Sequence, residues 1–174
     1  TPIREAIRKL ELEGLVLMIP RKGAEVAEIT EKNMLDVLEV RKALEELAAE
    51  LACERITQEQ IKELKVAAEE FRQTLQSGDV TRIAEADVQF HDVIFAATDN
   101  QRLISLLNNL REQMYRFRVE YLKQKECYPQ LLEEHQQMIK MIESHQKKEA
   151  RAIAGRHIDN QAVSVSDALR EKKE

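Results

Sequence analysis

The chain has 174 residues, of which 43% are hydrophobic and 34% are charged. With only 4 glycines and 3 prolines, this composition disfavours an all-β or disordered protein and favours helices. No apolar run approaches the roughly 20 residues that cross a membrane, so we expect no membrane partner. Cys53 and Cys127 stand alone without a CxxC motif, and we interpret them as reduced thiols of a cytoplasmic protein.

Charge is distributed unevenly along the chain. Residues 1–23 hold five basic and three acidic side chains, a net charge of +2, whereas the remainder carries −7. A small basic segment on an acidic body is typical of a protein that contacts nucleic acid at one end.

The N-terminal segment predicts a helix followed by a β-hairpin. Thr1 is a suitable N-cap, Pro2 suits the first helical position, and Gly14 is a normal residue after a helix C-terminus. The β-prone segments 15–19 and 24–29 are joined by a turn that carries two cations. We assign residues 1–29 to a first, small domain.

From Thr30 onward the apolar residues recur at helical spacing, and the pattern predicts an all-α bundle of six antiparallel helices over residues 30–174. The expected helices span about residues 31–54, 57–77, 80–97, 101–125, 130–146 and 149–171. In the first of them, the residues expected to face the core are Val37, Val40, Leu44, Leu47 and Leu51.

Four polar side chains fall on the inward faces of three different predicted helices. Asp87 and His91 are four residues apart, so they project from one helix face, while His135 and His157 lie on apolar stripes of the last two helices. Any one such histidine is more often a packed core residue than a ligand. Together, three imidazoles and a carboxylate predict a divalent metal site. Its net positive charge would favour an anionic ligand.

The nitrogen-rich donor set fits zinc first, with nickel, manganese and iron(II) as alternatives. A metal-dependent hydrolase or isomerase is one competing interpretation, because such a centre can activate water. Against it, the chain has no HExxH motif and no further general base beside the expected ligands. A purely structural metal is the other alternative.

Several segments resemble a known family of regulators. The stretch TPIREAIRKLELEGLVLMIPRKGAEV resembles the recognition helix and wing of the winged helix-turn-helix domain in GntR-family transcription regulators. The segments RKALEELAAELACERIT, DVQFH, EEH and GRH resemble the FCD effector-binding domain of the FadR-like branch. The likeness covers nearly the whole chain. It implies a homodimeric, ligand-responsive, DNA-binding regulator that is not an enzyme and that responds to a small carboxylate.

The resemblance also implies roles for individual residues. Asp87, His91, His135 and His157 match the metal ligands of the family. The positions that match the effector pocket are Arg41, Tyr115, Arg118 and Asn160. For Arg41, the alternative is a helix-surface ion pair with Glu45, four residues further on.

The DNA-contacting positions implied by the resemblance are Thr1, Arg4, Arg8, Arg21, Lys22 and Gly23. Arginines on a recognition helix suit guanine edges and phosphates, whereas the alternative for Arg4 and Arg8 is a solvated helix face. The match begins inside the recognition helix. The resemblance therefore assigns operator binding to the intact N-terminal domain, of which this chain shows the last part.

Overall fold

The computed structural model describes residues 2–28 and 30–171. Thr1, which the resemblance assigns to DNA binding, lies outside the described residues. Within them, no helix is both long enough and apolar enough to cross a membrane.

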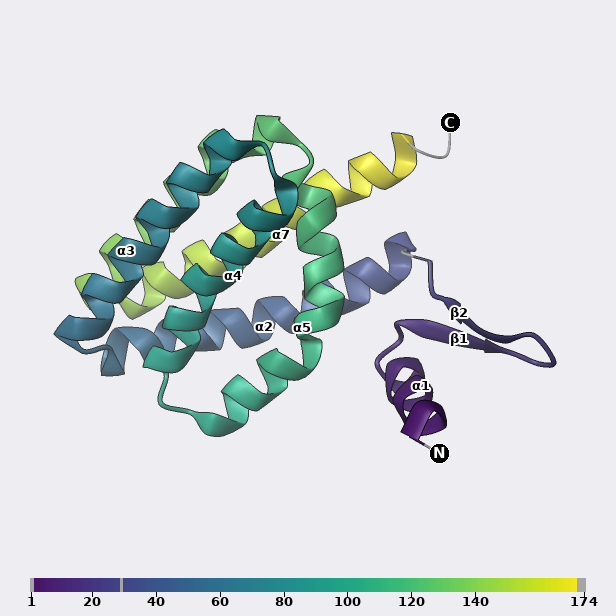
Figure 1. Cartoon of the computed structure of the whole chain (residues 1–174). Helices are drawn as coiled ribbons and strands as arrows, with labels where there is room; N and C mark the ends of the chain where they lie inside the picture. The colour runs from purple at the N-terminus through teal and green to yellow at the C-terminus, as the bar shows by residue number, and fades with distance from the viewer. Residues whose placement is uncertain (1, 29, 172–174) are drawn as a thin grey trace.

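The N-terminal unit consists of one helix and a two-stranded hairpin, as the sequence predicts. Helix α1 spans Pro2–Leu12, and the antiparallel strands β1 and β2 span Val16–Ile19 and Gly23–Val26. Gly14 takes a φ of 71° after α1, a conformation that costs glycine little. The hairpin tip points away from the other helices (Figure 1).

Residues 30–171 form the predicted helical bundle. The helices are α2 (Glu31–Arg55), α3 (Gln58–Thr74), α4 (Val80–Ala97), α5 (Gln101–Leu122), α6 (Tyr128–Glu143) and α7 (Lys147–Glu171). Short 3-10 turns at Leu75–Ser77 and Lys125–Cys127 follow α3 and precede α6. The all-α prediction is therefore confirmed, although α5 ends earlier and α6 begins earlier than expected.

Side chains before the helices fix where several of them start. Thr57 and Gln60 form a reciprocal capping box at the start of α3. Asp79 accepts hydrogen bonds from two backbone N–H groups at the start of α4, and Asn100 accepts one at the start of α5. These caps satisfy backbone donors that have no partner inside the helix.

Helices α2 and α7 pack along each other, and α3 packs on α4 (Figure 1). The buried apolar side chains form two clusters. One includes Ala48, Ala52, Leu64, Ile94, Met138, Ile142 and Ile153. The other includes Met34, Leu38, Phe71, Ile83, Leu131, Ile158 and Val165. Along α2, α4 and α6, buried polar side chains lie between the residues of the two clusters. Buried polar residues of α5 and α7 join them, and we call the whole set the polar layer: Arg41, Glu45, Asp87, His91, Arg118, Glu134, His135, His157 and Gln161.

The buried face of α2 differs from the predicted one. Val40 and Leu47 are 51% and 38% exposed, whereas Arg41, Glu45 and Ala48 are buried. The prediction was wrong because α2 carries apolar residues on more than one face. Its inward face also carries a charged pair, which a hydrophobic pattern excludes from the core.

Candidate metal centre

The polar layer brings together the four predicted metal ligands. Asp87 and His91 project from α4, His135 from α6 and His157 from α7, and each of the four is at most 2% exposed. One nitrogen from each of the three imidazoles lies within 4.8 Å of the other two. Asp87 Oδ1 lies 3.3 Å from His135 Nε2 and 3.9 Å from His91 Nε2. Residues up to 70 positions apart in sequence thus converge on one point.

Helix geometry and aromatic packing hold these side chains in place. The four-residue spacing puts Asp87 and His91 on the same face of α4, one turn apart. The His135 ring stacks on Phe90, with 4.0 Å between centroids, and contacts Phe71 at 4.9 Å. These rings restrict His135 to an orientation that faces Asp87.

The ionisation states suit metal binding. Burial lowers the pKa of His135 to about 4 and also lowers the pKa of His157, so both rings are neutral near pH 7. Burial alone would raise the pKa of Asp87, but the nearby Arg118 guanidinium and the histidines outweigh it and hold this pKa well below its usual value. Neutral imidazoles and an ionised carboxylate are the forms that bind divalent cations.

Several buried polar atoms of the layer have no hydrogen-bond partner. Those able to bind a cation are both carboxylate oxygens of Asp87, Nε2 of His91 and both ring nitrogens of His135. A buried polar group without a partner costs roughly 1–3 kcal/mol, and a charged one costs more. A cation that accepts electron pairs from several of these atoms at once would remove that cost, so the residues present fit a metal ion.

Arg118 of α5 is the immediate countercharge of Asp87. Its Nε lies 2.5 Å from Asp87 Oδ2, and both side chains are at most 3% exposed. The two atoms are at ion-pair distance but lack the alignment of a hydrogen bond, so both also remain without a hydrogen-bond partner. Arg118 is therefore part of the polar layer, and its role in effector binding stays a prediction.

Arg41 lies in the same layer and is already hydrogen-bonded to two side chains of the protein. Its Nε donates to Glu45 Oε1 at 2.6 Å, its Nη1 donates to Gln161 Oε1 at 2.7 Å, and its Nη2 is buried without a partner. The alternative ion pair with Glu45 does form. It is buried, however, with Arg41 wholly inaccessible, and so it is not a surface pair.

The other two effector candidates lie differently. Asn160 is half-buried on α7 and donates to Glu134 Oε1 at 2.5 Å. Tyr115 is outside the layer and lines a surface hollow of about 450 Å³ between α4 and α5, together with Arg111 and Asp92. A constriction of only about 10 Å³ beside this hollow is lined by His91 and Arg118, among others. That constriction is barely large enough for one water molecule.

Three residues of the layer were not predicted as site residues. They are Glu45, Glu134 and Gln161, all of which are buried. Each has a spacing that could have indicated it: Glu45 follows Arg41 by one turn, Gln161 follows His157 by one turn, and Glu134 precedes His135 directly. Such spacings are common on exposed helix faces too, and only the burial distinguishes these three.

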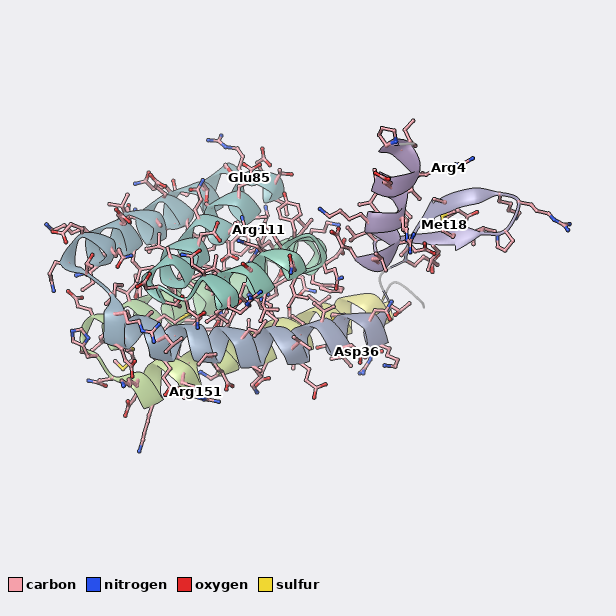
Figure 2. The ribbon with its side chains drawn as sticks, turned by 90° about the horizontal axis from the view of Figure 1, so that it is seen from below. Arg4, Met18, Asp36, Glu85, Arg111 and Arg151 are labelled. Carbon is pink, nitrogen blue, oxygen red and sulfur yellow. The ribbon has the colours of Figure 1, made fainter. Side chains whose placement is uncertain are left out.

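The proposed DNA-contacting residues form a separate group. Arg4 and Arg8 are exposed on α1, and Arg21, Lys22 and Gly23 are exposed at the hairpin turn. Figure 2 shows Arg4 on α1, which stands with the hairpin to one side of the helical bundle. Arg21 and Gly23 have φ angles of 66° and 103°, so the tight turn depends on residues in the left-handed region.

A family profile described as "FCD domain" matches residues 36–160. The chain belongs to the FCD family of GntR-type transcriptional regulators. Among curated relatives, the uncharacterized HTH-type transcriptional regulator YdhC of Bacillus subtilis is 26% identical over 100% of this chain and 78% of its own length. The gluconate operon transcriptional repressor of the same species is 28% identical over 83% of this chain and 61% of its own length.

Solved structures show the same fold. McbR/YncC of E. coli superimposes with a TM-score of 0.85 at 18% identity, covering 95% of this chain and 83% of that one. A GntR-family regulator from Pseudomonas syringae covers 99% of this chain and 72% of its own, with a TM-score of 0.65 and 23% identity. The curated relatives are named as transcriptional regulators and not as enzymes, which decides against the hydrolase or isomerase alternative.

Proposed function

We propose that this FCD domain is a metal-dependent sensor of a small carboxylate, and that ligand binding changes how the chain binds operator DNA. Asp87, His91, His135 and His157 would hold one divalent cation, zinc in the first instance. The observation that carries the proposal is the convergence of three buried imidazoles and a buried carboxylate, among which Asp87, His91 and His135 have polar atoms without partners. A bound cation supplies positive charge and an open position to which a carboxylate oxygen can bind.

Arg41 and Arg118 would recognise the carboxylate beside the cation. Arg41 retains a buried Nη2 amino group that has no partner, and Arg118 approaches Asp87 without a hydrogen bond. Guanidinium groups bind carboxylates through charge-assisted hydrogen bonds. Because the constriction beside His91 is so small, entry there would require a local separation of α4 and α5. Such a separation supplies a way for binding at the layer to alter the surrounding helices.

DNA would be bound through the N-terminal units of two associated copies. The side chains of Arg4, Arg8, Arg21 and Lys22 are exposed and project from a segment of positive charge. We propose that a second copy packs on the outer face of α2, where Val40 and Leu47 remain exposed. A dimer suits this class because helix-turn-helix proteins read paired half-sites.

The small constriction also favours a second candidate, a cation that only stabilises the bundle. A thermal-shift experiment distinguishes the two functions. Zinc should raise the unfolding temperature of metal-free protein in both cases, but only a sensor should show a further rise with gluconate, lactate or citrate. His135→Ala should abolish the zinc response. No response of the unaltered chain to zinc would overturn the proposal, and a response to zinc alone would leave the stabilising cation.

A further inference from the structure

The hydrogen bonds around His157 fix which of its ring nitrogens carries the proton. Arg41 has only N–H donors, so the Gln161 oxygen must be the atom that accepts from it. The Gln161 amide nitrogen is therefore turned toward His157 Nε2, 2.9 Å away. An amide nitrogen can only donate, so Nε2 must accept and the neutral ring must carry its proton on Nδ1.

That proton has a carboxylate to receive it. His157 Nδ1 lies 2.7 Å from Glu134 Oε2, which accepts the hydrogen bond. A second histidine has the same arrangement, because His91 Nδ1 lies 3.3 Å from Glu45 Oε2 while its Nε2 is buried without a partner. In both cases the Nδ1 side faces a glutamate.

We propose that Glu134 and Glu45 are positioning residues, which hold His157 and His91 in the Nδ1–H tautomer and so leave Nε2 unprotonated and able to bind the cation, which at His157 would displace the Gln161 donor. This inference rests on the proposed function. A ring that binds metal through one nitrogen commonly donates from the other to a carboxylate, which fixes the ring and makes it a stronger ligand. The two glutamates would do this from α6 and α2.

Each glutamate is itself held by other side chains. Glu134 accepts hydrogen bonds from Asn160, at 2.5 Å, and from Gln130, at 3.0 Å. Burial alone would raise its pKa, but the contacts with His157, Asn160 and Gln130 outweigh this and lower the pKa to about 2. Glu45 is held by Arg41, whose charge contributes most to lowering the pKa of that buried carboxyl. Both acceptors therefore stay ionised near pH 7.

Arg41 and Asn160 consequently acquire a role beyond the effector pocket. Through Glu45 and Gln161, Arg41 acts on both His91 and His157, and through Glu134, Asn160 acts on His157. His135 is the exception among the three rings. Its Nδ1 has no partner, and it is held by the Phe90 and Phe71 rings instead.

Nitrogen-15 NMR of the metal-free, unaltered chain tests the tautomer directly and needs no variant. His157 should show the Nδ1–H form, and an Nε2–H form would overturn the inference. This result does not depend on whether zinc binds. A failure of the proposed function, which is absence of zinc binding, therefore remains distinguishable from a failure of this inference.

Glu134→Gln tests the consequence for the cation. Zinc affinity, measured by competition with a chromophoric chelator, should fall about 10–100-fold, and the Nδ1–H preference of His157 should weaken. Glu133→Gln is the matched control, because Glu133 is the adjacent exposed residue and should leave both readouts unchanged. Wild-type affinity together with an unchanged tautomer in Glu134→Gln would overturn the positioning role.

Discussion

The middle of the helical bundle and the N-terminal unit use their charged residues in opposite ways. In the bundle, Arg41, Glu45, Asp87 and Arg118 are all at most 3% exposed and are held between two apolar clusters. In the N-terminal unit, α1 buries no residue at all. Charges removed from water must be matched by partners within the protein, whereas exposed charges remain available to a partner outside it. The comparison predicts large effects on stability in the first region and small ones in the second.

The largest effect is expected from Asp87→Ala in the metal-free protein. Removal of the carboxylate leaves Arg118 buried without its nearest countercharge, and breaking such a pair costs about 3–5 kcal/mol of unfolding free energy. Urea denaturation measures the loss. Asp92→Ala is the matched control on the same helix. It breaks a half-exposed pair with Arg111 and should cost less than about 1 kcal/mol. Equal losses would contradict the contrast between buried and exposed charge.

Substitution of apolar side chains tests the same difference in stability between the bundle and the N-terminal unit. Leu131 is fully buried in the cluster beside the polar layer, so Leu131→Ala should lower the unfolding free energy by about 2–5 kcal/mol. Leu12, at the end of α1, is 80% exposed, and Leu12→Ala should change it by less than about 0.5 kcal/mol. Chemical denaturation of both variants checks this. A large loss at Leu12 would show that the N-terminal unit has a core of its own.

Acid should destabilise the bundle through His135. Its pKa falls from 6.5 to about 4 on folding, so between these values the unfolded chain takes up a proton that the folded chain does not. Stability is therefore present above pH 6.5 and decreases as the pH falls toward 4, by on the order of 1–3 kcal/mol. Denaturation at several pH values measures the slope, which should be smaller in His135→Gln. An identical slope in that variant would assign the effect to other groups.

The smallest effect on stability is expected from Arg4→Ala on the exposed surface of α1. The unfolding free energy should change by less than about 0.5 kcal/mol. Affinity for duplex DNA should nevertheless fall, and the dependence of log K on log salt should decrease by about 1 if Arg4 contacts a phosphate. Fluorescence anisotropy measures both quantities. Lys148→Ala, an exposed change on α7, is the control, and an equal loss of affinity there would argue against a specific role for α1.

The sequence predicted helix bounds and the hairpin best where residues close together in the chain determine the structure. The bounds of α4 agree with the prediction because Asp79 caps its start and a regular apolar stripe follows. The same regularity predicted that Asp87 and His91 lie together, since a four-residue spacing places two side chains on one face of a helix. The hairpin was predictable from its turn, and Gly23 and the cations of the turn lie where expected.

The parts that sequence patterns missed depend on contacts between distant residues. Glu45 and Glu134 resemble many exposed glutamates of helices, and they differ only in the arginine, amide and imidazole groups that meet them across the bundle. The inward face of α2 was misassigned for the same reason. A hydrophobic pattern treats Arg41 as a surface residue, although Glu45 and Gln161 supply the partners that allow its burial.

The central claim is that one divalent cation sits among three histidines and an aspartate. An anomalous difference map from a crystal of the zinc-loaded protein, recorded at the zinc absorption edge, tests it most directly. We predict one strong peak about 2.0–2.2 Å from a nitrogen of each of His91, His135 and His157 and from an oxygen of Asp87. A map with no peak in the polar layer, or with its peak elsewhere on the molecule, would contradict the account.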